Sequence, residues 1–126
     1  MPIHYEIKDG VVYTILEGRV TDDEILSYYE QPFFEDSKFQ WREIVDGRLI
    51  TDMQITPNGQ KRLAGLVATK ADKLRGGRVT MVASNDITFG MFRMWEAQRG
   101  DIDYEVHVFR NIGAALEWIM LPHGKP

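Results

Sequence analysis

Residues 41–74, WREIVDGRLITDMQITPNGQKRLAGLVATKADKL, decide the fold of this chain. The first six residues are predicted to form a short apolar strand and residues 47–55 a polar loop, after which TPNG opens the longest helix that the sequence supports. Apolar side chains recur at the 3.6-residue period of one helix face, at Leu63, Leu66, Val67, Ala71 and Leu74. A strand that feeds a helix through a loop predicts an α/β domain.

Both ends of this helix carry recognisable signals. Thr56 is a suitable N-cap, and Pro57 suits the first turn because its missing N–H would be unpaired there. Gly76 and Gly77 can end the helix in a left-handed conformation. One unbroken helix is therefore predicted between Pro57 and the two glycines.

The start of the chain predicts a β-hairpin. Apolar and charged residues alternate over residues 3–8, which is typical of a half-buried strand, and Asp9 and Gly10 supply a two-residue turn. Residues 11–17 are apolar at nearly every position and form the return strand, which Gly18 ends.

Strands and helices alternate over the rest of the chain. The order ββαβαβαβα predicts a mixed, mostly parallel sheet of about five strands with four helices and right-handed crossovers. The remaining elements are predicted as a helix at residues 22–31, a strand at 78–84, a helix at 87–98, a strand at 104–110 and a helix at 112–121.

Composition limits the possible functions. The 126 residues fit one domain, and 44% apolar residues are enough for a hydrophobic core. No Cys and three scattered His argue against a metal site, and no cofactor is predicted. No apolar run is long enough to cross a bilayer, and the first ten residues do not resemble a signal peptide. A cytoplasmic protein is expected.

Positive charge gathers on the central helix and its exit. The net charge is −4, yet six of the 15 basic residues lie between residues 57 and 78. A solvated helix face is favoured over an anion-binding surface, and nucleic-acid binding is not expected of an acidic chain without aromatic residues among these charges. The six are Lys61, Arg62, Lys70, Lys73, Arg75 and Arg78.

Two stretches carry a family resemblance. The segment GGRVTMVAS at residues 76–84, which leads into a helix, and the ending VFRNIGAALEWI at residues 108–119 resemble the STAS domains of anti-sigma-factor antagonists. They resemble the small stand-alone SpoIIAA-like proteins more closely, and the resemblance covers essentially the whole chain. It implies a single SpoIIAA-like domain in a bacterial, cytoplasmic and often dimeric protein of unassigned biochemical role.

The central loop departs from the STAS pattern. Such antagonists carry Asp-Ser-Ser-Gly where this loop meets its helix, and a partner kinase phosphorylates the second Ser. With Asp46 placed at the family's strand-end Asp, residues 56–59 (TPNG) fall on that motif, and the Gly alone matches. Asn58 occupies the phosphoacceptor position and Thr56 is the neighbouring hydroxyl. The resemblance therefore implies a binding or regulatory domain that is not switched by phosphorylation at this loop.

Loops at the carboxyl ends of parallel strands meet at one rim, where ligands tend to bind. Arg110 and Asn111 are also predicted to lie at this rim. The alternative interpretation is that Thr56, Asn85 or Asp86, and Asn111 only cap helices. The candidate ligand or partner site at this rim consists of Asp46, Arg48, Thr56, Asn58, Ser84, Asn85 and Asp86.

Catalysis is not predicted. No spacing marks a nucleophile with its base, a phosphate-binding glycine loop or a carboxylate pair, and His107 is expected to line a sheet face. A minor alternative is a tautomerase that uses the amine of Pro2, but those enzymes pass from the first strand directly into a helix. Asp9 and Gly10 instead turn this chain into a second strand.

The helix at residues 87–98 is apolar beyond one stripe. It is either an ordinary buried helix or a contact surface, in which case Phe89 and Met94 are the predicted interface of a homodimer. The sequence predicts a non-catalytic domain that binds a protein partner or a small ligand. The alternative function is a carrier of a small apolar or amphipathic ligand, with a pocket lined by Phe33, Phe34, Phe39, Phe89 and Trp95.

Overall fold

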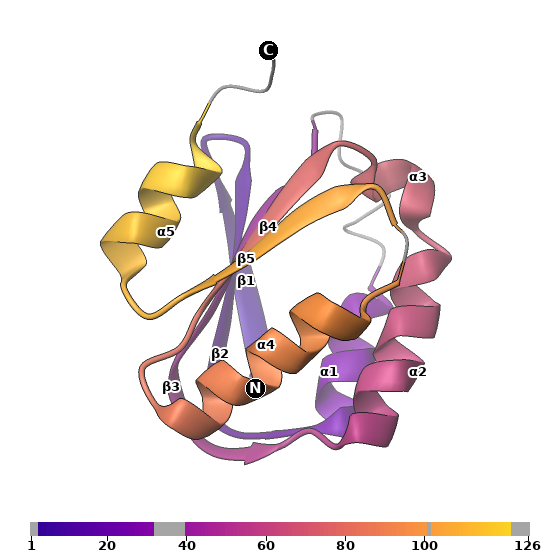
Figure 1. Cartoon of the computed structure of the whole chain (residues 1–126), viewed down its shortest axis with the longest axis vertical. Helices are drawn as coiled ribbons and strands as arrows, with labels where there is room; N and C mark the ends of the chain where they lie inside the picture. Colours follow the sequence, from indigo (N-terminus) through magenta and orange to yellow (C-terminus); the bar gives the residue numbers. More distant parts are fainter. Residues whose placement is uncertain (1–2, 32–39, 101, 122–126) are drawn as a thin grey trace.

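The computed structural model describes residues 3–31, 40–100 and 102–121 (Figure 1). No helix within these ranges has both the length and the apolar character needed to cross a membrane. Along the chain the elements are β1 (Ile3–Lys8), β2 (Val11–Thr21), α1 (Asp22–Tyr29), β3 (Arg42–Gln54), α2 (Pro57–Ala68), α3 (Ala71–Leu74), β4 (Gly77–Val82), α4 (Asp86–Gln98), β5 (Tyr104–Phe109) and α5 (Ile112–Ile119).

The five strands form one mixed sheet in the order β1-β2-β3-β4-β5. β1 pairs with β2 antiparallel, and the other neighbours are parallel, so the predicted α/β class and strand order along the chain are confirmed. Asp9 and Gly10 both have positive φ, as a tight two-residue hairpin requires.

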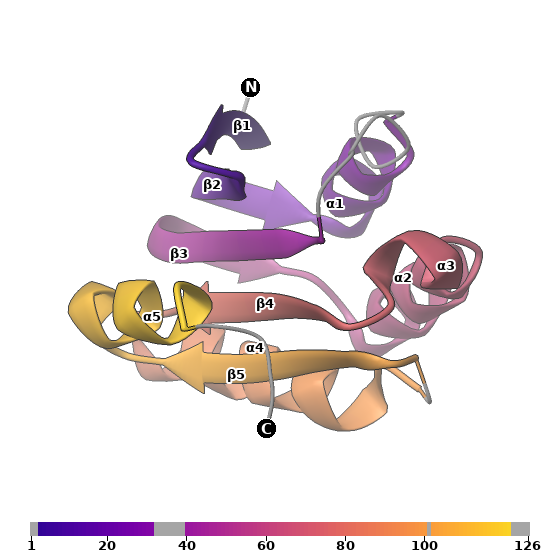
Figure 2. The same cartoon turned by 90° about the horizontal axis from the view of Figure 1, so that it is seen from above.

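Two cores lie on opposite faces of the sheet. α1, α2 and α4 cover the larger core, where Leu16, Val45 and Val106 are buried beneath them. α5 covers the smaller core on the other face, where Ala115 and Ile119 pack against the strands (Figure 2). Residues next to each other in a strand therefore serve different cores.

The predicted loop at residues 47–55 is wrong, because β3 continues through most of it to Gln54. The tail of β2 runs past Gly18 to Thr21 and pairs with this part of β3, from Glu17 opposite Leu49 to Thr21 opposite Gln54. Polar side chains are tolerated because the strand's backbone groups are satisfied by the neighbouring strand while many of the side chains face solvent.

The prediction of one unbroken central helix is also wrong, and the described residues contain five helices instead of four. α2 ends at Ala68 and α3 begins at Ala71. The Thr69 hydroxyl donates to the carbonyl oxygen of Leu66 at 2.6 Å, where it competes with the backbone bonds of the helix. The apolar pattern continues beyond the end of α2, since Leu74 of α3 is buried in the larger core.

β1 is less buried than its alternation predicts. Ile3 is buried, but Tyr5 is 37% exposed and Ile7 is 54% exposed. β1 is an edge strand, and α1 covers only part of its inner face: Tyr5 meets Tyr28 of α1 edge to face, with ring centroids 6.2 Å apart.

Arg78 does not belong to a solvated face, because it is buried on β4 beneath the end of α5. Its Nη1 atom donates to the carbonyl oxygens of Trp118 at 3.4 Å and Leu121 at 2.5 Å, and its Nε atom lies 3.3 Å from Glu105. Carbonyls at a helix C-terminus carry partial negative charge, so this guanidinium holds α5 on the sheet.

We expect Arg78→Leu to lower the free energy of unfolding by about 2 kcal/mol, because it removes charge-assisted hydrogen bonds to the carbonyls at the end of α5. Urea denaturation measures the loss. The control is Arg75→Leu, since Arg75 pairs with Asp72 in solvent and its loss should change stability by less than about 0.5 kcal/mol. Equal losses in both variants would contradict this role for Arg78.

Candidate functional site

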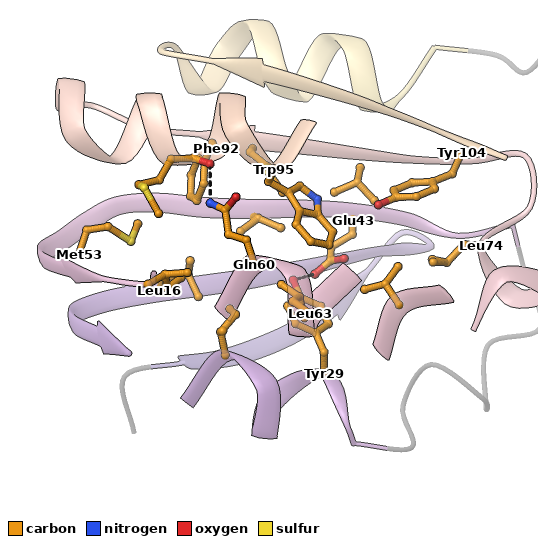
Figure 3. Close-up of a pocket in the computed structure, with 17 residues that line it drawn as sticks. Leu16, Tyr29, Glu43, Met53, Gln60, Leu63, Leu74, Phe92, Trp95 and Tyr104 are labelled. Carbon is orange, nitrogen blue, oxygen red and sulfur yellow. Dashed lines mark hydrogen bonds between the residues drawn. The ribbon is translucent and has the colours of Figure 1, made fainter. Parts of the chain in front are cut away.

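A cavity of about 70 Å³ lies between the sheet and the layer of α1, α2 and α4 (Figure 3). Most of the side chains around it are aliphatic or aromatic, and they come from four helices and four strands. Among the lining residues are Leu16, Tyr29, Glu43, Met53, Gln60, Leu63, Leu74, Phe92, Trp95 and Tyr104.

Side chains of α2 and α4 form the helix side of the cavity. Gln60, Leu63 and Val67 stand at i, i+3 and i+7 on one face of α2. Phe92 and Trp95 lie three residues apart on α4 and face α2 across the cavity. The predicted cap at Thr56 is confirmed, because Thr56 accepts from the Gly59 N–H. Of the two candidates Asn85 and Asp86, Asn85 caps α4, because it accepts from the Thr88 N–H.

Glu43 on β3 is a buried carboxylate on the sheet side of the cavity. Its Oε2 atom accepts hydrogen bonds from the Thr14 hydroxyl at 2.6 Å and the Tyr29 hydroxyl at 2.8 Å. The Trp41 indole N–H reaches its Oε1 atom at 3.4 Å. The Tyr28 and Thr14 hydroxyl oxygens are 2.7 Å apart, so the network extends into α1.

Burial raises the pKa of the Glu43 carboxyl above its ordinary value, and the hydrogen bonds from Thr14, Tyr29 and Trp41 only partly oppose this. Burial, followed by the charge of Glu43, likewise raises the pKa values of Tyr28 and Tyr29. Both tyrosines therefore keep their protons near neutral pH and remain donors in this network.

Gln60 on α2 is the second polar group in the lining of the cavity. It is 4% exposed, and its Nε2 atom donates to the Met91 carbonyl oxygen of α4 at 3.0 Å (Figure 3). Its Oε1 atom is buried and has no hydrogen-bond partner among the described residues. A buried acceptor without a partner is costly, so this oxygen marks where a bound donor would fit.

The entrance to the cavity is indicated by the lining residues that solvent partly reaches. Met53 and Ile55 at the end of β3 and Met91 of α4 are half-buried, whereas most of the other lining residues are buried. Methionine side chains are flexible, so this side of the cavity can adapt to an occupant.

The structure divides the predicted rim site into two groups. Arg48 binds Asp46 through two side-chain hydrogen bonds of 3.0 and 2.8 Å, and the Ser84 hydroxyl donates to the Arg48 carbonyl oxygen at 3.3 Å. Burial raises the pKa of Asp46, but the hydrogen bonds and charge of Arg48 outweigh it and the pKa falls below its ordinary value. Asp86 pairs with Arg110 at 2.8 Å nearby on α4.

Thr56 and Asn58 belong to the other group, beyond the end of β3. Eight residues separate Arg48 from Thr56, and an extended strand rises about 3.3 Å per residue, so the extra length of β3 carries Thr56 away from Asp46. Thr56 binds Asp22 of α1 through its backbone N–H at 2.8 Å and its hydroxyl at 2.6 Å. Asn58 is exposed in the first turn of α2.

A surface depression of about 300 Å³ lies where the second half of β3 faces the start of α4. Asn85 and Asp86 of the predicted site line it, together with Ile50, Thr51, Met53, Ile87 and Thr88.

The aromatic pocket predicted for a carrier agrees with the cavity at one residue. Trp95 lines the cavity, Phe89 is not among the lining residues, and Phe33, Phe34 and Phe39 lie outside the described residues. Phe89 and Met94, the predicted dimer interface, are half-buried, and the Arg110 guanidinium stands 4.1 Å from the centre of the Phe89 ring.

Two lining residues that matter chemically were missed by the sequence analysis, although each left a signal. Glu43 is a charged residue inside the apolar stretch 41–46, and Gln60 lies three residues before Leu63 on the apolar stripe of α2. His107 is exposed on β5 and meets the Trp118 ring at 4.6 Å. The described residues contain no cluster of three acidic or His side chains that could hold a metal ion.

We expect the stability difference between wild type and Glu43→Gln to depend on pH. Because the folded pKa of Glu43 is raised, its contribution is present below the ordinary carboxyl pKa and is lost as the pH rises through the folded value. Glutamine cannot ionise, so the free energy of unfolding of the variant should rise relative to that of the wild type between about pH 4 and pH 8. Urea denaturation at both pH values checks this, with Glu117→Gln on the exposed face of α5 as control. A constant difference would show that Glu43 is not perturbed by burial.

No known family model and no curated protein matches this chain. Among solved structures, it is similar to an uncharacterized protein of the DUF3478 family from Shewanella loihica PV-4, which is described as having a SpoIIAA-like fold. The similarity covers 93% of this chain and 91% of that one, with a TM-score of 0.60 and 13% identity. At this identity the likeness concerns the fold, and the resemblance seen in the sequence is confirmed at that level: the chain has a SpoIIAA-like α/β fold.

Proposed function

We propose that this protein is a non-catalytic domain that binds a small, largely apolar ligand in the cavity beneath α1, α2 and α4. The observation that carries the proposal is the cavity itself, which has apolar walls and two buried polar groups, Glu43 and Gln60. Concave, mostly apolar sites with a few placed polar groups are the usual form of small-molecule sites. The geometry thus favours the carrier alternative over a partner site at the rim.

The chemistry of the lining residues supports binding without catalysis. Three neighbouring donors engage the carboxylate of Glu43, so its oxygens are directed at protein groups. The raised pKa of Tyr29 disfavours the phenolate that a nucleophile or base would need. No pair of a nucleophile and a base is seen in the lining of this cavity.

The regulatory alternative has less support at the rim. The side chains of Asp46 and Arg48 bind each other, and the Thr56 hydroxyl is engaged with Asp22 and Gly59. These groups are occupied by contacts within the chain, which suits a structural role.

We expect a small apolar molecule such as toluene to raise the melting temperature of the wild type. At a free concentration of about 100 times Kd, ligand binding adds roughly 2.7 kcal/mol, which corresponds to about 5 °C or more for a domain of this size. Val67→Phe should abolish this rise, because the larger side chain fills the cavity from α2. Differential scanning calorimetry measures both effects.

The matched control is Ala68→Phe, which makes the next residue of α2 larger on its exposed side and should leave the ligand-induced rise unchanged. If toluene and similar molecules leave the wild type unchanged at saturating concentrations, the cavity holds water or stays empty and the proposed function is wrong.

Self-association through α4 remains a separate prediction. Phe89→Ser with Met94→Ser should convert a dimer into a folded monomer, because a symmetric contact uses each residue twice. Light scattering at high protein concentration measures the oligomeric state, and a monomeric wild type would contradict this prediction.

A further inference from the structure

The polar groups of the cavity restrict the kind of ligand it accepts. The clearest restriction comes from Gln60, because the nitrogen of its side-chain amide has a hydrogen-bond partner and the oxygen has none among the described residues. The Nε2 atom is held by the Met91 carbonyl at 3.0 Å, which fixes the side chain between α2 and α4. The Oε1 atom is left buried and without a partner among the described residues. An amide oxygen can only accept hydrogen bonds.

The hydrogen bond to Met91 also fixes which way the amide faces. If the amide were turned by half a rotation, its oxygen would meet the Met91 carbonyl oxygen, and two acceptors would face each other without a proton. The orientation with the oxygen unpaired is therefore the favoured one. An occupant of the cavity meets a fixed acceptor.

We infer that the ligand is a small apolar body carrying a hydroxyl or N–H group, which donates to Gln60 Oε1. This inference rests on the proposed function and specifies its ligand class. An anionic headgroup is disfavoured, because Gln60 Oε1 on α2 would repel it and Glu43 on β3 adds a second acidic or acceptor group to the lining of the same cavity. The ligand is thus unlike a fatty acid, whose carboxylate needs donors.

The volume limits the size of the apolar body. The cavity of about 70 Å³ is roughly half the 150 Å³ of an engineered cavity that binds benzene. Small movements of Met53, Met81 and Met91, which all line it, are needed to admit even one ring. The ligand is no larger than a single ring or a short branched chain.

Phenol and toluene test the inference, because they have nearly the same shape and differ in one donor group. The ratio of their dissociation constants is measured by isothermal calorimetry for wild type and for Gln60→Met, which keeps an unbranched side chain but has no amide oxygen. We expect the preference for phenol to fall by about tenfold in the variant, as loss of one buried hydrogen bond predicts. Thr88→Val is the control, since the Thr88 hydroxyl oxygen is also buried without a hydrogen-bond partner among the described residues, but Thr88 does not line this cavity. This variant should keep the wild-type ratio.

A measurement on the wild type covers the case in which Gln60→Met does not fold. The side-chain carbonyl carbon of Gln60 should shift in the NMR spectrum on addition of phenol and much less on addition of toluene. If both molecules bind but the ratio or this shift does not depend on the donor, the inference is overturned while the proposed function stands. If neither molecule binds the wild type, the proposed function fails and the inference fails with it.

Discussion

The side of the sheet that α1, α2 and α4 cover depends on the hydrogen bonds of one buried carboxylate, Glu43 on β3. An unpaired carboxylate would cost several kcal/mol in this environment, so its oxygens must be met by donors. Thr14 supplies one from β2 and Tyr29 supplies another from α1. Because these donors come from separate elements, the carboxylate fixes α1 over the neighbouring strands. Side chains that are held by hydrogen bonds cannot collapse freely, which helps to keep the adjacent space open.

The length of β3 sets where the helices over this space begin. Its pairing with the tail of β2 ends with Thr21 opposite Gln54, so α1 and α2 start beside each other. The carboxylate of Asp22 then reaches Thr56, and the close fit needs glycine at residue 59, because a Cβ atom there would lie 1.9 Å from an Asp22 oxygen. Thr56 and Gly59 therefore have a packing role at the very place where the STAS resemblance puts a regulatory motif.

Local signals in the sequence predicted most of the fold, and the errors arise where distant residues decide. The hairpin, the cap at Thr56, and the alternation of strands and helices depend on neighbouring residues and were predicted correctly. The extension of β3 depends on a partner strand some thirty residues earlier, which no local pattern shows. The polar groups of the cavity were missed for the same reason: Glu43 and Gln60 are polar residues in apolar patterns, and their partners lie on other elements.

The contacts of Thr56 support the prediction that phosphorylation does not switch this loop. Its hydroxyl donates to Asp22 and accepts from the Gly59 N–H, so it joins α1 to α2 as well as capping α2. Phosphorylation would remove the hydroxyl hydrogen that Thr56 donates to Asp22, and it would place a phosphate of about −1.5 to −2 charges against the Asp22 carboxylate. Ile25 and Tyr29 of α1 and Leu63 of α2 line the cavity, so separating the two helices would disturb its walls. The charge repulsion and the packing both oppose modification here, in agreement with the prediction that phosphorylation does not switch this loop.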